Sequence, residues 1–221
     1  MERKVAVIKK SIQLAENLKS QLTKEILEIE GFSSAKIRHL LNNINYYLAQ
    51  DIENFKVNYL EIGTYHGSTF ISALFNNNIN LAVGIDNYSQ FAGSQKKLES
   101  NLNEHIKDLM LSGKILILNQ NFEDVFSKKI LGDKKFNVYF YDGRHGKGDQ
   151  FNAFAFVNDN LDDQFIAIVD DWNEERVKIG TRLAFNKLDY NIIEEFHLKS
   201  DYNGDEENWW NGLYIALISK N

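Results

Sequence analysis

The chain has 221 residues, a formal net charge of -6 at pH 7, and 43% apolar and 25% charged residues, which is ordinary for one globular domain with a substantial core. The acidic balance argues against a nucleic-acid partner, because phosphate contacts need clustered Lys and Arg. The absence of Cys excludes disulfides, thiolate metal ligands and a cysteine nucleophile. No apolar run is long enough to span a membrane, and the charged N-terminus is unlike a signal peptide, so we expect a cytoplasmic protein without a membrane partner.

The N-terminal quarter of the chain predicts two helices and no strand. Apolar residues recur at helical spacing from Val5 to Ile29, which predicts one helix over that range. Ser33 and Ser34 then suit the cap of a second helix that runs to about Ala49. We expect residues 1–56 to form a helical extension packed on the core, and residues 57–221 to form the main domain.

From residue 57 onward, short and almost continuously apolar strands alternate with segments long enough for helices. Such strands are typical of a parallel sheet that is covered on both faces. The alternation predicts a Rossmann-like, doubly wound α/β fold with helices on both faces, and the last two strands, which no helix separates, predict a C-terminal antiparallel hairpin. The seven predicted strands, five parallel ones and the hairpin, are Val57–Ile62, Leu81–Ile85, Lys114–Leu118, Asn137–Tyr141, Phe165–Val169, Asn191–Leu198 and Gly212–Ile218.

The motif YLEIGTYHGST joins the first predicted strand to a helix and is typical of a nucleoside-binding turn. Gly63 and Gly67 let the backbone approach a ligand, and the helix that opens on Ser68 offers free N–H groups. Asp86 ends the second strand, where an acid can accept hydrogen bonds from the ribose hydroxyls. A dinucleotide fingerprint needs a further glycine where this chain has Tyr65, so the spacing disfavours NAD.

Glu61 lies just before the first glycine, where a carboxylate attracts a cationic ligand and repels a pyrophosphate. With these residues the chain resembles the class I S-adenosylmethionine-dependent methyltransferases from residue 57 to about Lys220. The resemblance implies that Glu61 and the two glycines contact the methionine part of S-adenosylmethionine, and that Asp86 holds its ribose. The expected cofactor-binding residues are Glu61, Gly63, Thr64, Tyr65, Gly67, Ser68, Asp86, Asn87, Asn121, Phe122 and Asp142.

Asn121 and Phe122 belong to this set by resemblance alone. Asn121 lies where the family often has an acid or amide near the adenine amine, and Phe122 would pack on the adenine ring. The alternative is purely structural: Asn121 caps a helix and Phe122 is a core aromatic. The sequence leaves both interpretations open.

Three aspartates fall at the ends of two neighbouring predicted strands. Asp142 follows one strand in NVYFYDGRHG, and Asp170 and Asp171 follow the next in FIAIVDDWN. Because the tips of adjacent strands lie side by side, we expect these carboxylates to converge, and they would then repel one another unless a proton or cation intervenes. A set of oxygen ligands suits Mg²⁺ or Mn²⁺. The alternative is that Asp170 and Asp171 cap the following helix.

The D-G-x-H and D-D segments resemble the metal-dependent small-molecule O-methyltransferases, particularly the sugar-modifying group that includes the macrocin and mycinamicin O-methyltransferases. The resemblance implies that Asp142, Asp170 and Asp171 are metal ligands, that His145 is the catalytic base, and that Asp142 and Asp170 take part in catalysis. The alternative for His145 is a loop histidine that only tethers the strand end. Arg144 departs from the D-G-D-H pattern of that group, because it stands in place of the second acid.

The expected function is therefore metal-assisted methylation of a hydroxyl on a small molecule, such as a sugar or secondary metabolite, with S-adenosylmethionine as donor and Mg²⁺ or Mn²⁺ as metal. Three alternatives stay open: an NAD(P)-binding oxidoreductase, a non-catalytic nucleoside-binding protein on the same fold and, more remotely, a metal-dependent hydrolase. The sequence does not identify the acceptor, and it leaves open whether the chain forms a homo-oligomer.

Overall fold

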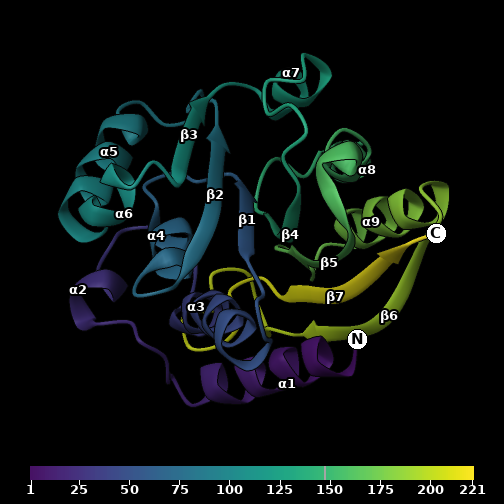
Figure 1. The fold of residues 1–221 in the computed structure, drawn as a ribbon, viewed down its shortest axis with the longest axis horizontal. Coiled ribbons are helices and arrows are strands. Elements are labelled where there is room, and N and C mark those ends of the chain that lie inside the picture. The colour runs from purple at the N-terminus through teal and green to yellow at the C-terminus, as the bar shows by residue number, and fades with distance from the viewer. Residues whose placement is uncertain (147) are drawn as a thin grey trace.

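The computed structural model describes residues 1–146 and 148–221. Its strands are β1 (Val57–Ile62), β2 (Ile79–Asp86), β3 (Ile115–Asn119), β4 (Phe136–Tyr141), β5 (Leu161–Val169), β6 (Tyr190–Leu198) and β7 (Leu213–Lys220). They form one seven-stranded sheet in the order β3-β2-β1-β4-β5-β7-β6 (Figure 1). The strands β1 to β5 pair in parallel, whereas β7 pairs antiparallel with both β5 and β6. The predicted parallel sheet with a C-terminal antiparallel hairpin is confirmed.

Helices cover both faces of this sheet (Figure 1). Buried residues of α1, α3, α4 and α5 join one apolar core, while those of α7, α8 and α9 join a second core on the opposite face. The helices are α1 (Glu2–Glu16), α2 (Lys24–Leu27), α3 (Ala35–Asp51), α4 (Ser68–Leu74), α5 (Ser94–His105), α6 (Lys107–Leu111), α7 (Phe122–Ser127), α8 (Asp149–Ala155) and α9 (Glu175–Lys187), with a 3₁₀ turn at Asn158–Asn160. Every helix in the described part of the chain is too short or too polar to cross a membrane.

The alternation of side chains along β4 explains why both cores are apolar. Val138 and Phe140 belong to the core under α1 and α3, whereas Tyr139 and Tyr141 belong to the core under α8 and α9. Successive side chains of a strand point to opposite faces, so a central strand must be apolar throughout. All six residues of β4 are buried, and the next residue, Asp142, leaves the sheet at its carboxyl edge.

The prediction of one N-terminal helix over Val5–Ile29 is wrong. The first helix, α1, ends at Glu16, where Leu18 takes a positive φ of 51° and the N–H of Lys19 donates to the carbonyl of Leu14 at 3.0 Å. A left-handed residue with this reversed hydrogen bond closes a helix. The apolar period continues past the break because residues beyond α1 also pack on the core, although in a different element.

The second helix was predicted correctly. In α3, the Ser34 hydroxyl accepts a hydrogen bond from the N–H of Ile37 at 3.4 Å, which caps the first turn. Residues 28–34, which join α2 to α3, are called the strap here because they cross the start of α4.

The buried guanidinium of Arg38 fastens the chain that leads into the strap. It donates to the carbonyl oxygens of Leu27 at 2.9 Å and Ile29 at 3.2 Å, to that of Ile26, and to the Ser72 hydroxyl at 3.0 Å. Burial lowers the pKa of Arg38 to about 10, so the side chain is still charged at neutral pH. Charge-assisted hydrogen bonds of this kind hold the segment firmly.

The strap and α4 touch at Gly31. A Cβ added at Gly31 would lie 1.9 Å from the Ser68 Oγ and 2.5 Å from the Ser68 Cβ. We expect Gly31→Ala to lower the free energy of unfolding by about 1–3 kcal/mol, the usual cost of overpacking. The same substitution in a Ser68→Gly background should cost less, because the obstructing atoms are gone. Urea denaturation followed by circular dichroism measures both, and equal costs in the two backgrounds would contradict the contact.

Candidate functional site

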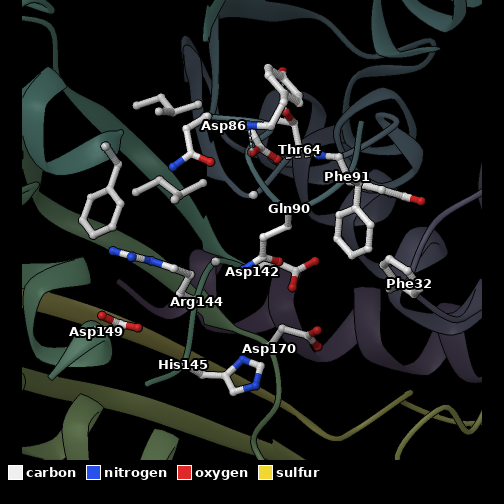
Figure 2. Close-up of a pocket in the computed structure, with 18 of the residues that line it drawn as sticks. Phe32, Thr64, Asp86, Gln90, Phe91, Asp142, Arg144, His145, Asp149 and Asp170 are labelled. Carbon is white, nitrogen blue, oxygen red and sulfur yellow. Dashed lines mark hydrogen bonds between the residues drawn. The ribbon is translucent and has the colours of Figure 1, made fainter. Parts of the chain in front are cut away.

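A cleft of about 850 Å³ opens at the carboxyl ends of the parallel strands (Figure 2). Its floor includes the residues that directly follow three strands: Gly63 after β1, Asp142 after β4 and Asp170 after β5, together with Asp86 at the end of β2. In doubly wound sheets, ligands bind at this edge. The strand ends that the sequence singled out therefore do meet in one cavity.

The turn after β1 is held in place by its neighbours. Gly63 has a φ of 95°, and a Cβ there would lie 1.9 Å from the carbonyl oxygen of Asp142, so only glycine lets β1 and β4 approach this closely. The N–H of Tyr65 donates to Asp86 Oδ2 at 2.9 Å, and the N–H of Tyr88 donates to Asp86 Oδ1 at 2.8 Å. Asp86 thus shapes the turn and still has lone pairs free for a ligand in the cleft.

Glu61 lies behind the cleft and does not line it. Its carboxyl group is completely buried, where it accepts hydrogen bonds from the Tyr59 hydroxyl at 2.5 Å and the Thr69 hydroxyl at 2.7 Å. Burial raises the pKa of Glu61 to about 8. Gly67 is also absent from the lining and packs against side chains of α4 and α5. The other predicted cofactor residues do line the cleft: Gly63, Thr64, Tyr65, Ser68, Asp86, Asn87, Asn121, Phe122 and Asp142.

Asn121 and Phe122 have structural roles and also line the cleft. The Asn121 side chain accepts from the N–H of Glu123 at 3.4 Å and caps α7. Phe122 is 7% exposed and meets the Tyr141 ring edge-on at 6.0 Å. The two interpretations of these residues are therefore compatible, because the helix cap and the core aromatic both sit at the cavity wall.

The three aspartates converge as predicted. Asp142, Asp170 and Asp171 each offer a carboxylate oxygen, and these oxygens lie within 4.8 Å of one another. The register of β4 on β5, in which Tyr141 pairs with Val169, brings the strand ends level. Neither Asp170 nor Asp171 is needed as a cap, since α9 begins later, at Glu175. We call these three residues the acidic triad.

The acidic triad is electrostatically strained without a cation. Burial raises the pKa of Asp142 and of Asp170 well above the usual range, and repulsion by the neighbouring carboxylates raises both further. The Oδ1 atom of Asp170 is buried and has no hydrogen-bond partner within the described residues. An unpaired buried carboxylate oxygen beside two other carboxylates fits a hard divalent cation such as Mg²⁺ or Mn²⁺.

Asp171 differs from the other two aspartates because protein groups approach both of its oxygens. Its Oδ1 accepts from the Asn211 amide at 2.7 Å, and its Oδ2 lies 3.0 Å from His145 Nδ1. The histidine contact is a close approach, since Nδ1 has no hydrogen bond to any described residue. Asp171 is thus suited to orient His145 as well as to bind a cation.

The sequence did not place Phe32 or Asn203 in the cleft. Phe32, from the strap, lines the cavity although no motif surrounds it in the sequence, and Asn203 reaches the cavity from the connection between β6 and β7. The sequence does suggest Trp210 and Phe91 as aromatics of an apolar acceptor wall, from their places on the hairpin connection and near a strand tip, and both line the cavity. Exposure of a large apolar side chain inside a cavity could have revealed Phe32, but that signal exists only in three dimensions.

Comparisons with known proteins support the fold. No protein-family model matches the sequence, and no curated protein matches it either. Among solved structures, a proposed caffeoyl-CoA O-methyltransferase from Staphylococcus aureus aligns over 97% of this chain and 99% of its own, with a TM-score of 0.60 and 16% identity. The O-methyltransferase TomG from Streptomyces achromogenes, solved with S-adenosylmethionine, aligns over 96% and 89%, with a TM-score of 0.56 and 16% identity.

A proposed RNA methyltransferase from Pyrococcus horikoshii aligns over 100% of this chain and 99% of its own, with a TM-score of 0.57 and 14% identity. Identities this low establish the fold and not the reaction. The chain therefore has the Rossmann-like fold that these methyltransferases share.

Repulsion within the acidic triad predicts how the stability of the protein depends on pH. The pKa of Asp170 is higher in the native state than in the unfolded chain, so the native state binds the proton more tightly. This proton therefore stabilises the fold at acidic pH, and the stabilisation is lost as the pH rises through the native-state pKa. We expect metal-free Asp170→Asn to be more stable than the wild type at pH ~7, because the neutral amide removes a buried charge and its repulsion by the neighbouring carboxylates. The difference should vanish near pH ~4, where the unfolded carboxyl group titrates.

Thermal denaturation in EDTA at several pH values measures this difference. Asp149→Asn is the matched control, because Asp149 lines the same cleft outside the acidic triad and should give no such gain. A loss of stability in Asp170→Asn at neutral pH would show that the carboxylates do not strain the fold.

Proposed function

We propose that the protein is an S-adenosylmethionine-dependent methyltransferase that methylates a hydroxyl group of a small molecule with the help of a divalent cation. The observation that carries the proposal is the meeting, in one cleft, of a glycine turn with Asp86 and of the acidic triad. The fold shared with methyltransferases adds support, including one neighbour solved with S-adenosylmethionine.

The cofactor fits the side of the cleft formed by β1, β2 and α7. Asp86 would accept the ribose hydroxyls, and the adenine would lie against Phe122 near the Asn121 amide. The turn from Gly63 to Ser68 would hold the methionine part, with the N-terminus of α4 near its carboxylate. Glu61 acts from behind, since its hydrogen bond from Thr69 fixes a residue that does line the cleft.

The acidic triad would hold the cation next to the methyl group. A bound Mg²⁺ or Mn²⁺ lowers the pKa of an acceptor hydroxyl and fixes its position. Burial and then repulsion by neighbouring carboxylates raise the pKa values of Asp142 and Asp170, so a cation would offset an unfavourable negative charge at both. Asp171 completes the set while it holds His145 at 3.0 Å.

S-adenosylmethionine supplies the methyl group: the carbon–sulfur bond breaks as a carbon–oxygen bond forms, and sulfur keeps the electron pair in S-adenosylhomocysteine. The chain's own residues align the two partners, which can contribute roughly 7–11 kcal/mol to catalysis. His145 takes the hydroxyl proton at Nε2, because its Nδ1 faces Asp171.

A small-molecule acceptor is favoured over a nucleic acid. The formal net charge is -6, and the acidic triad adds negative charge at the reacting end of the cleft. The negatively charged phosphate groups of a nucleic acid at this edge would be repelled rather than attracted. An NAD(P)-dependent reaction is disfavoured because Tyr65 occupies the place where a dinucleotide fingerprint has its middle glycine.

Ligand binding separates these functions. We expect S-adenosylmethionine and S-adenosylhomocysteine to raise the melting temperature and NAD to leave it unchanged, since a ligand at 100 times its dissociation constant adds about 2.7 kcal/mol. Mg²⁺ should stabilise the wild type and Asp149→Asn but not Asp142→Asn. Differential scanning fluorimetry measures all of these shifts. A shift with NAD alone would refute the methyltransferase, and an undiminished Mg²⁺ response in Asp142→Asn would refute the metal site.

The role of His145 predicts a loss of rate without a loss of cofactor. In methyl transfer from labelled S-adenosylmethionine to an acceptor found by screening, His145→Ala should lower kcat by about 10²–10⁴, the range usual for acid–base catalysis. His197→Ala is the control, because His197 also lies near a carboxylate, Glu195 at 3.4 Å, and does not line the cleft. A loss below tenfold would mean that His145 is not the base.

A further inference from the structure

Two phenylalanines keep large apolar areas exposed inside the cleft. Phe32 is 52% exposed and Phe91 is 43% exposed, and both line the cavity that contains the acidic triad. Phenylalanine is normally buried, and concave sites with apolar walls and a few convergent polar groups are typical of small-molecule binding. We therefore expect an apolar group of a ligand to pack on the exposed rings within the cleft.

The two rings form one surface with Tyr65. The ring centroids of Phe32 and Phe91 lie 5.5 Å apart, and that of Tyr65 lies 5.0 Å from each. Figure 2 shows Phe32 and Phe91 on the side of the cleft next to Asp142 and Asp170, and Arg144 and Asp149 on the other side. We call Phe32, Tyr65 and Phe91 the aromatic wall. It lines the same cavity as the acidic triad, which would hold the reacting hydroxyl.

The strap holds the aromatic wall in position before any ligand arrives. Arg38 binds the carbonyl oxygens just before and within the strap, and Glu30 forms an ion pair with Lys97 of α5 at 2.6 Å. Gly31 rests against Ser68 with no room for a Cβ. A preformed apolar surface costs little conformational entropy when it binds a ligand.

The chemistry of the aromatic wall restricts its occupant. The side chains of Phe32 and Phe91 offer no hydrogen-bonding atom, so a sugar hydroxyl facing them would lose its water without a replacement, which is costly. The methionine part of the cofactor carries an ammonium and a carboxylate and also gains little there. A flat apolar ring can instead pack on both phenylalanines in the offset or edge-on arrangements that aromatic groups prefer.

We propose that Phe32 and Phe91 are specificity-determining residues of the acceptor subsite, and that the acceptor carries its reacting hydroxyl on an aromatic ring rather than on a sugar. This inference rests on the proposed methyltransferase function. It assigns a role to the N-terminal segment, because Phe32 belongs to the strap and not to the part of the chain that builds the sheet.

Binding to the full-length protein saturated with S-adenosylhomocysteine and Mg²⁺ tests the inference without turnover. Isothermal titration with catechol, an aromatic diol, and with methyl α-mannopyranoside, a sugar that has vicinal hydroxyls and no aromatic ring, compares the two acceptor classes. We expect catechol to bind and the mannoside to show no binding at the same concentrations. Phe32→Ala and Phe91→Ala should each weaken catechol binding by about five- to twentyfold, since aromatic contacts and lost burial add up.

Phe32→Leu keeps apolar volume without a ring and should fall between the wild type and Phe32→Ala. Tyr202→Ala removes an aromatic side chain that is 62% exposed and lies outside the cleft lining, so it should change nothing. Affinity for S-adenosylhomocysteine should stay within about twofold in every variant, because Phe32 and Phe91, unlike Tyr65, lie outside the turn from Gly63 to Ser68 that is assigned to the cofactor. Phe91 lies on a different loop from Phe32, so one variant tests the wall even if the other folds poorly.

The outcomes separate this inference from the proposed function. If the wild type fails to bind S-adenosylhomocysteine, the methyltransferase proposal fails and the acceptor subsite fails with it. If S-adenosylhomocysteine binds but the mannoside binds better than catechol, or if both alanine variants bind catechol as the wild type does, the aromatic-acceptor inference is wrong and the methyltransferase proposal stands.

Discussion

Repulsion among Asp142, Asp170 and Asp171 is the constraint around which the cleft is arranged. The parallel register of β4 on β5 forces the strand ends level, and the chain places carboxylates at both ends within 4.8 Å of one another. Burial makes the repulsion expensive, because the effective dielectric is lower there than in water. A fold rarely keeps such strain without use, and strain of this kind concentrates at functional sites. A divalent cation turns the same three charges from a cost into a stabilising set of ligands.

The rest of the cleft is built outward from these charges by groups that fix geometry. Asn211 and His145 hold Asp171, while the Asp86 carboxylate holds the turn at Tyr65 through its backbone N–H. The opposite wall comes from the N-terminal segment, which Arg38 binds through buried hydrogen bonds to carbonyl oxygens. A helical extension that only shielded the sheet would not need a buried cation at this point. Its placement makes sense if residues of the strap contact a ligand.

The sequence predicted the sheet and the acidic triad because both depend on local patterns. Continuously apolar strands such as Phe136–Tyr141 predict burial on both faces of the sheet. An acidic residue that directly follows such a strand then lies at the carboxyl edge of the sheet. Glu61 shows the limit of this reasoning. Its place in the chain is right for a ligand contact, yet the strand turns its side chain toward Tyr59 and Thr69. Phe32 was beyond reach, since its position follows from long-range contacts of Arg38 and Gly31 that leave no periodic trace.

A tight backbone contact joins the two halves of the cleft. Gly63 belongs to the turn proposed for the cofactor, and the carbonyl of Asp142 fills the space where any other residue would have a Cβ. The N–H of Asp142 also donates to the carbonyl of Ile62 at 2.9 Å. The turn proposed for the methyl donor and the proposed metal ligand Asp142 are therefore parts of one rigid unit. In-line methyl transfer depends on a fixed separation between the methyl carbon and the attacking oxygen. A backbone contact that only glycine allows is a direct way to set that separation, because side-chain motion cannot alter it.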